Sequence, residues 1–390
     1  MHQTNITTMK KKHLLLGAAL TIGLCACNTN KQESNKSLHQ AYADAFKVGC
    51  AINQRIASGR DSIANALLLH HFNAISPENE LKAETIHPRP GVWNFGPADR
   101  YVQFGLDNNM HILGHTLVWH NQTPSFFFNN EDGTAKTKEQ MIETMREYIE
   151  KVVTRYNGKI DAWDVVNEII DNDGSYRPTT WVNSFGGDGD AVVLNAFKFA
   201  EQYAPGTELY YNDFNAWRPE KRDGIARMVR MLQKNGVRID GIGIQAHWGL
   251  NFPKNEYITA AIDTFAALGV KVMITEMDMD VLPLTKEGQI IGKSMQESQF
   301  QLEEFEIFFD PYKDGLPDDV QAQLTARYKE LLQIFYDKRD KIDRVTFWGL
   351  HDSMSWKNDY PIPNRTNYPL LFNRDYSAKP ALEAILSIPD

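Results

Sequence analysis

The chain has 390 residues, 42% of them hydrophobic and 11% aromatic, so it can bury a large core. Its net charge of −9, with no long basic cluster beyond three lysines at 10–12, argues against nucleic acid as a partner. The length suggests two or three domains of about 150 residues each, although a single (β/α)8 barrel domain spans from about 200 to over 400.

The first 27 residues have the features of an export signal. The lysines at 10–12 precede an apolar run at 14–27, which is typical of a secretory signal peptide and too short for a stable membrane span. The tetrapeptide Leu-Cys-Ala-Cys at 24–27 resembles a bacterial lipobox. We therefore expect 1–27 to be a lipoprotein signal peptide. A lipid on Cys27 would be the only membrane attachment and would hold the protein in the bacterial cell envelope, on the periplasmic or the cell-surface side of the outer membrane. Without lipidation the protein would be secreted.

Residues 28–40 are expected to be a flexible tether, because 28–37 are rich in Asn, Lys, Gln and Ser. The rest of the chain, 41–390, is expected to be one catalytic domain. After removal of the signal, Cys50 is its only unmodified thiol, so no intramolecular disulfide can form. Cys50 lies in an apolar run at 48–52, which indicates a buried core cysteine.

Eight apolar runs bounded by turn signals predict strands, at 46–53, 72–79, 111–119, 160–168, 208–215, 241–248, 271–278 and 345–352. Helical patterns lie between them, for example at 138–156, 221–235 and 324–338. Strands that alternate with helices predict a parallel sheet. Eight units, without a Gly-x-Gly-x-x-Gly turn after the first strand, favour the α/β class and a closed (β/α)8 TIM barrel.

The predicted strands end in polar or aromatic residues: Asn53, Glu78, Asn79, Trp119, His120, Asn167, Glu168, Asn212, Asp213, Gln245, His247, Glu276, Asp278, His351 and Asp352. In a parallel barrel these ends meet on one face, where active sites form. Neighbours along a regular strand point to opposite faces, so the fourth strand should end or bulge near Asn167 if Asn167 and Glu168 both face the site. Residues 283–319, after the seventh strand, are expected to pass over the rim of this face.

Two of these ends carry the residue type that cleaves a glycosidic bond. The segments at 163–168 and 272–278 each run from an apolar strand into a glutamate, Glu168 and Glu276. Glycoside hydrolysis uses one carboxylic acid to protonate the leaving oxygen and a second carboxylate as nucleophile or base. The pair is therefore our catalytic candidate. The chain has no His-Glu-x-x-His motif and few cysteines, so we expect neither a catalytic metal nor a cofactor.

Four motifs, in order, extend this interpretation. They are Ser-Pro-Glu-Asn-Glu-Leu-Lys at 76–82, Gly-His-Thr-Leu-Val-Trp-His-Asn-Gln at 114–122, Trp-Asp-Val-Val-Asn-Glu at 163–168 and Ile-Thr-Glu-Met-Asp at 274–278. Together they resemble glycoside hydrolase family 10, the retaining endo-xylanases, from about Phe46 onwards. The resemblance implies that Glu168 is the acid/base and Glu276 the nucleophile. It also implies that Asn167 holds the 2-hydroxyl of the attacked sugar.

The resemblance further implies that Gln245 and His247 flank the nucleophile, with His247 bonding its carboxylate. Trp348 and Trp356 would form the aromatic cover of the cleft. Contacts to the sugar on the glycone side are implied for Glu78, Asn79, Lys82, His115, Trp119 and Gln122. His120 follows Trp119 directly, and a structural role for it stays open.

Three positions depart from the family pattern. Ala83 stands where tryptophan often follows the lysine, His87 precedes Pro88 where glutamate is usual, and Met277 follows the nucleophile. These are supporting positions, so the departures bear on the shape of the glycone subsites rather than on catalysis.

The expected activity is retaining endo-hydrolysis of internal β-1,4-xylosidic bonds in xylan or xylo-oligosaccharides by a monomer. The two carboxyl groups should then lie about 5 to 5.5 Å apart. One alternative is a hydrolase of β-1,4-glucan or mixed-linkage glucan, whose hydroxymethyl groups need space beside Lys82 and Trp348. Another is a lipid-anchored glycan-binding protein without catalysis. A structural or scaffold protein would leave the converging polar strand ends unexplained.

Overall fold

The computed structural model describes residues 36–282, 310–360 and 362–389. The predicted signal peptide, Cys27 and the tether up to residue 35 lie outside the described residues, as do residues 283–309 of the predicted excursion over the rim. No helix within the described ranges is long and apolar enough to cross a membrane.

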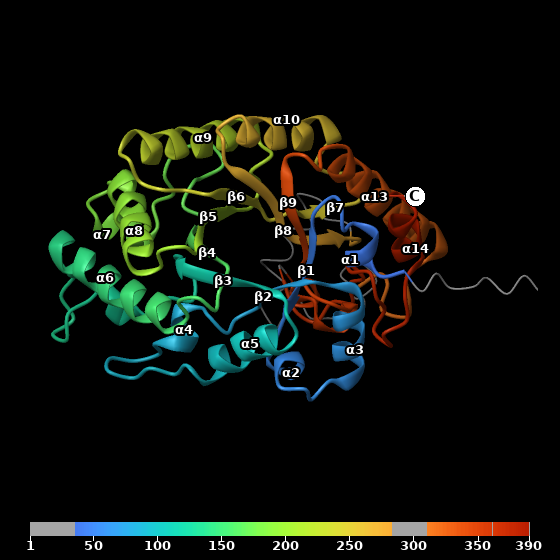
Figure 1. The fold of residues 1–390 in the computed structure, drawn as a ribbon, viewed down its shortest axis with the longest axis horizontal. Coiled ribbons are helices and arrows are strands. Elements are labelled where there is room, and N and C mark those ends of the chain that lie inside the picture. The colour runs from blue at the N-terminus through green and yellow to red at the C-terminus, as the bar shows by residue number, and fades with distance from the viewer. Residues whose placement is uncertain (1–35, 283–309, 361, 390) are drawn as a thin grey trace, which may run out of the picture. The chain divides into compact units, whose positions relative to one another are not determined.

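Eight parallel strands form a closed barrel, as predicted (Figure 1). They are β1 (Lys47–Ile52), β2 (Ala74–Pro77), β3 (His111–Val118), β4 (Ala162–Asn167), β5 (Glu208–Asp213), β6 (Gly241–Ile244), β8 (Lys271–Asp280) and β9 (Ile342–Phe347). Successive strands of the barrel pair with each other, and β9 pairs with β1. β6 pairs with the first part of β8, and the short β7 (His247–Gly249) pairs with its last part. All eight carboxyl ends therefore meet on one face of the barrel.

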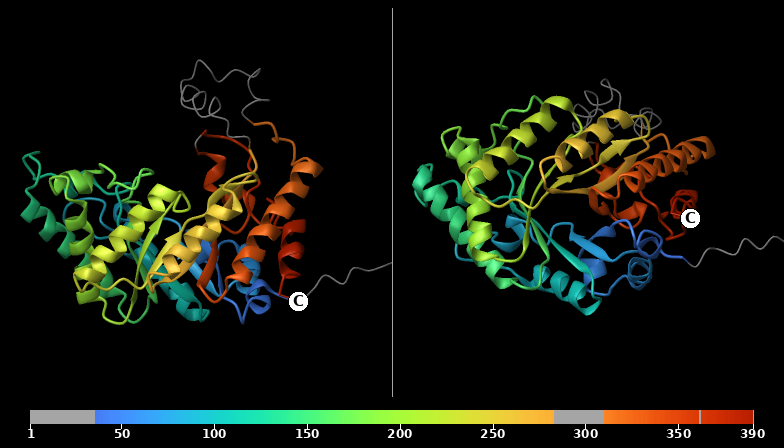
Figure 2. Two further views of the ribbon diagram at one scale, coloured as in Figure 1. Left: turned by 90° about the horizontal axis from the view of Figure 1, so that it is seen from above. Right: turned by 45° about the horizontal axis from the view of Figure 1, so that its top comes forward.

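Helices connect the strands and lie outside them in both views of Figure 2. The longer ones are α3 (Ser62–His71), α5 (Gly96–Asp107), α6 (Lys138–Arg155), α8 (Gly189–Tyr203), α9 (Pro219–Lys234), α10 (Asn255–Ala266), α13 (Asp318–Asp337) and α14 (Pro380–Leu386). Short turns of helix are α1 (Leu38–Ala41), α2 (Gln54–Ala57), α4 (Ala83–Ile86) and α7 (Thr180–Ser184). The predicted helices at 138–156, 221–235 and 324–338 correspond to α6, α9 and α13.

Local sequence explains where these helices begin and which side they bury. Before α6, Thr137 and Gln140 form a capping box, in which each side chain accepts a hydrogen bond from the backbone N–H of the other. Met141, Met145 and Ile149 follow at spacings of four and are buried. This apolar stripe packs the helix against the barrel, because residues four apart share one face.

The predicted irregularity of the fourth strand is confirmed. β4 ends at Asn167, its register shifts between Asp164 and Val166, and Glu168 adopts a left-handed conformation with φ of 59°. A non-glycine residue is uncommon in this region, and such conformations concentrate at functional sites. The turn lets the adjacent Asn167 and Glu168 side chains reach the same cavity.

Two strand predictions were wrong in extent. The predicted sixth strand, 241–248, is divided into β6 and β7, because Ala246 has a left-handed φ of 64°. The predicted eighth strand ends at Phe347, so His351 and Asp352 are not strand-end residues that face the site. Asp352 is instead fully buried in an ion pair with Lys379, at 2.7 Å.

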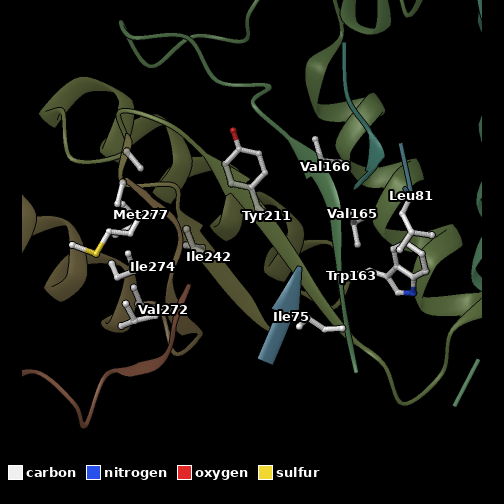
Figure 3. Packing of buried hydrophobic residues seen from close by; sticks show 14 of the residues in the cluster. Ile75, Leu81, Trp163, Val165, Val166, Tyr211, Ile242, Val272, Ile274 and Met277 are labelled. Atoms are coloured by element: carbon white, nitrogen blue, oxygen red, sulfur yellow. The ribbon is translucent and has the colours of Figure 1, made fainter. Parts of the chain in front are cut away.

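The apolar core fills the space between barrel and helices, and Figure 3 shows part of it. Cys50 is buried there, as predicted. One close approach depends on a missing side chain: Gly114 of β3 pairs with Trp163 of β4, and a Cβ at position 114 would lie 2.2 Å from the indole ring. Trp163 is itself buried, so the ring has little room to move.

Gly114→Ala should therefore lower the free energy of unfolding by about 1–3 kcal/mol through overpacking. Urea denaturation measures the change. Gly96→Ala is the matched control, because its added Cβ would meet nothing closer than 3.6 Å. Equal stability of the two variants would contradict the predicted clash.

Candidate active site

A cavity of about 520 Å³ opens at the carboxyl ends of the strands. It is lined by Glu78, Asn79, Lys82, His115, Trp119, Asn121, Gln122, Asn167, Glu168, Phe214, Asn215, Gln245, His247, Glu276, Trp348, Trp356 and Tyr360. Every catalytic or sugar-binding candidate named from the sequence is among them. The structure thus brings together side chains from β3, β4, β7 and β8 and from the segments that follow β2, β3, β4, β5, β6 and β9.

The Glu168 carboxylate is held by neutral donors. Trp119 Nε1 donates to Oε2 at 3.0 Å, and Gln245 Nε2 donates to Oε1 at 3.0 Å. The Glu168 backbone N–H donates to the Asn212 carbonyl at 2.9 Å, which fixes the turn after β4. Arg177 adds a positive charge, with Nη1 4.0 Å from Oε2. The carboxyl group is thus oriented by neutral hydrogen-bond donors, and the only ion pair it makes among the described residues is the longer contact to Arg177.

The Glu276 carboxylate lies on β8 and is almost completely buried. Asn212 Nδ2 donates to Oε1 at 2.6 Å, and His247 Nε2 lies 3.1 Å from Oε2. Burial alone would raise the Glu276 pKa, but the His247 hydrogen bond, the positive potential at His115 and the Asn212 amide together hold it below its ordinary value. Glu276 is therefore ionised at neutral pH, as a nucleophile must be.

His247 lies between two carboxylates. Its Nδ1 is 3.0 Å from Asp278 Oδ2, opposite the contact to Glu276, and Trp356 Nε1 also donates to Asp278 Oδ2 at 2.8 Å. Burial opposes a charged imidazole, but Asp278 and Glu276 outweigh it and raise the His247 pKa to about 9. A protonated imidazole then donates to Glu276 from Nε2, forms an ion pair with Asp278 on its other side, and fixes the orientation of Glu276.

A polar group from the β2 and β3 motifs forms another wall. Lys82 Nζ donates to Asn79 Oδ1 at 3.0 Å, and Gln122 Nε2 donates to the same oxygen at 3.3 Å. Lys82 Nζ also lies 5.0 Å from the centre of the Trp119 ring. Burial lowers the Lys82 pKa and raises that of Glu78. Closely spaced donors and acceptors of this kind suit the hydroxyl groups of a sugar.

Aromatic rings form the remaining wall. Trp348 packs edge-on against His115, with ring centres 5.5 Å apart, and Trp356 stacks with Tyr360 at 5.0 Å. His115 is itself held by Asp164, which lies 2.9 Å from its Nδ1. Aromatic faces of this type stack on pyranose rings.

Sequence reasoning missed several residues of the site. Asn212 was named only as a polar strand end, although its side chain contacts both Asn167 and Glu276. Phe214 and Asn215 lie two and three residues after Asn212, directly after the end of β5, so their place was a usable signal. Tyr360 lies in an irregular segment and had none. The remaining cavity residue that was missed, Asn121, belongs to the quoted third-strand motif.

The positions that depart from the family pattern do not line the cavity. Ala83 is buried in α4, and His87 stacks on Trp93 with ring centres 3.9 Å apart. Met277 points into the core, where it is fully buried. His120 also lies outside the cavity lining, with Nε2 3.5 Å from Arg177 Nη1. Within the described parts of the chain, no three His, Cys, Asp or Glu side chains are arranged to hold a metal ion.

Comparison with known proteins agrees with this geometry. The sequence pattern of glycosyl hydrolase family 10 matches residues 37–388. The chain belongs to glycosyl hydrolase family 10. It is 37% identical to endo-1,4-beta-xylanase A of Xylanibacter ruminicola, over 88% of this chain and 90% of that protein. It is also 37% identical to the beta-1,4-xylanase of Dictyoglomus thermophilum, over 90% of each.

Solved structures also superpose on the chain. A family 10 endoxylanase from a sugarcane soil metagenome matches with a TM-score of 0.83 and 38% identity, over 91% of this chain and all of that one. A mutant structure in complex with xylotriose matches with a TM-score of 0.78 and 33% identity, over 90% of this chain and 99% of that one.

The raised His247 pKa predicts a pH-dependent contribution to stability. A folded-state pKa of about 9, above the ordinary 6.5, stabilises the native state fully below pH 6.5 and progressively less as pH rises towards 9. The stability difference between wild type and His247→Gln should therefore shrink by about 2–3 kcal/mol from pH 6 to pH 10. Urea unfolding at each pH measures it, and parallel curves would show that the imidazole is not charged in the folded state.

Proposed function

We propose that this protein is an endo-β-1,4-xylanase that cleaves internal xylosidic bonds by double displacement, with retention of configuration. The observation that carries the proposal is the contrast between two carboxyl groups in one cavity. Glu168 is held by the neutral donors Trp119 and Gln245, whereas Glu276 faces His247 and the Asn212 amide. One group is thus free to exchange a proton, and the other is kept ionised.

In the first step, the Glu276 carboxylate attacks the anomeric carbon while Glu168 donates its proton to the departing glycosidic oxygen. The products are a covalent glycosyl-enzyme and a free sugar hydroxyl. In the second step, the ionised Glu168 removes a proton from water, which attacks the same carbon and releases Glu276. Two inversions give net retention.

Neighbouring side chains support these steps. His247, held by Asp278, keeps Glu276 aimed at the anomeric carbon. Asn167 lines the cavity, bonded to the buried Asn212 behind it, and is placed to bond the 2-hydroxyl of the attacked sugar, a contact that strengthens as the transition state develops. Lys82 and Asn79 offer further hydrogen bonds on the glycone side, and Trp348 and Trp356 cover the ring.

Xylan is the proposed substrate for two reasons. The two relatives named above, which align over about nine tenths of the chain, are xylanases, and a solved structure in complex with xylotriose superposes on it. Trp348 is almost completely buried at the cavity wall, and xylose, which lacks a hydroxymethyl group at C5, needs no extra space beside it. The sequence of residues 1–27 further supports export and lipid anchoring at Cys27 in the cell envelope. We propose that the protein acts there as a monomer.

Wild-type protein should release reducing sugars from unsubstituted xylan and little from carboxymethylcellulose assayed in parallel. Glu276→Ala should remove nearly all of this activity, because no glycosyl-enzyme can form without the carboxylate. The exposed Glu143→Ala on α6 is the control and should retain activity. If folded wild-type protein releases no reducing sugar from xylan, the proposed substrate is wrong.

Glu168→Ala should separate two kinds of substrate. Loss of the acid should slow cleavage of xylan by about 10²–10⁴-fold. Aryl xylosides with good leaving groups need little protonation, so their first step should be affected much less. Release of the aryl group, followed by stopped-flow absorbance, tests this, and equal losses on both substrates would contradict the assigned role.

A further inference from the structure

A buried ion pair beside the cavity has no part in the proposed mechanism. Asp213, the last residue of β5, lies 2.7 Å from Lys221 Nζ in the first turns of α9, and neither side chain is exposed. A buried ion pair is weak evidence for stability, because desolvation offsets most of the attraction. Its position next to the site suggests another role.

The pair connects to the cavity through an aromatic ring. Lys221 Nζ lies 3.9 Å from the centre of the Phe214 ring, and the Arg177 guanidinium lies 4.9 Å from it. Phe214 lines the cavity. Arg177 also lies 4.0 Å from Glu168 Oε2. Lys221, Phe214 and Arg177 thus form a continuous path from the buried pair to the acid/base candidate.

The pair also connects to the backbone that carries Glu168. The Tyr211 hydroxyl donates to Asp213 and accepts from the Ile170 N–H at 3.2 Å, two residues after Glu168. The residue before Asp213, Asn212, accepts the Glu168 N–H at 2.9 Å. The left-handed turn at Glu168 is therefore attached to the strand end that bears Asp213.

We propose that Asp213, Phe214, Lys221 and Arg177, hereafter the acid/base support, position Glu168 and balance its two ionisation states, an inference that rests on the proposed function. Arg177 favours the ionised carboxylate that activates water, and Asp213 favours the protonated acid that meets the substrate. Lys221 moderates the charge of Asp213 and fixes Phe214. All four are positioning residues and transfer no proton themselves.

Other charged groups also face Glu168. Lys82, from the segment after β2, and Glu276, from β8, act on the same cavity, and His247 faces it from β7. His120, after β3, lies beside Arg177, and burial lowers its pKa, so it contributes little charge at neutral pH. These groups stay unchanged in the variants below, so differences between the variants report on the acid/base support.

The test is the pH dependence of kcat/KM on xylo-oligosaccharides, whose alkaline limb reports loss of the proton from the catalytic acid. Arg177→Met removes a positive charge and should move this limb to higher pH by about one unit. Asp213→Asn removes a negative charge and should move it to lower pH by about half a unit or more. Arg177→Lys should restore most of the wild-type profile.

A matched ion pair controls for general destabilisation. Lys379 and Asp352 are also fully buried, also 2.7 Å apart, and do not line the cavity. Lys221→Met and Lys379→Met should both unfold at lower urea concentration. Only Lys221→Met should slow the hydrolysis of aryl xylobiosides selectively, with a loss for poor leaving groups at least tenfold larger than the loss for good ones. The reason is that only substrates with poor leaving groups need a proton from the catalytic acid.

The proposed role of the acid/base support predicts that Arg177→Met and Asp213→Asn shift the alkaline limb in opposite directions. It also predicts that Lys221→Met slows mainly the substrates with poor leaving groups. Unmoved limbs, shifts in the same direction, or equal losses for both leaving groups in Lys221→Met would overturn it. Arg177 is partly exposed, so its variants test the idea even if the buried variants do not fold. Wild-type protein inactive on every xylo-oligosaccharide would instead refute the proposed function.

Discussion

Asn212 joins the two proposed catalytic groups, and the geometry of the site depends on it. Its carbonyl accepts the Glu168 N–H, while its side-chain amide donates to Glu276. Thr275 Oγ1 donates back to Asn212 Oδ1 at 2.6 Å, so the amide cannot rotate without losing bonds at both ends. This contact exists only because barrel closure brings β4, β5 and β8 to a common rim. An open sheet would leave β4 and β8 apart.

The same rim gives two chemically identical side chains different electrostatic surroundings. Around Glu276, burial is opposed by His247 and the Asn212 amide, which keep the nucleophile charged, and Asp278 acts on Glu276 only by keeping His247 protonated. Around Glu168, the closest donors are neutral and the nearest cation is 4.0 Å away. Retaining hydrolysis needs this asymmetry, because one carboxyl must never hold the proton during attack and the other must hold it and release it in turn.

Much of the fold and site could be predicted because the strands and helices of a barrel each have a recognisable pattern of apolar residues along the chain. Apolar runs that alternate with amphipathic helical patterns predicted the eight strand–helix units. The polar residues at the ends of the runs predicted most of the residues that line the cavity. The errors arose where backbone geometry departs from the regular strand. Ala246 breaks the sixth strand with a left-handed φ, and the chain after Phe347 turns away, so that Asp352 pairs with Lys379. The spacing of apolar residues does not indicate where the backbone leaves the regular strand conformation.

By itself, the sequence determined the barrel class, the glutamate pair and the family, because side-chain type and order along the chain are enough for these. Only the tertiary structure decided which groups surround each glutamate. Asn212 and Arg177 reach their partners across 64 and nine positions of the chain, and Lys221 meets Phe214 through the path of α9. Charge interactions and hydrogen bonds depend on distances in space. Closure of the barrel sets these distances, and the spacing of residues along the sequence does not.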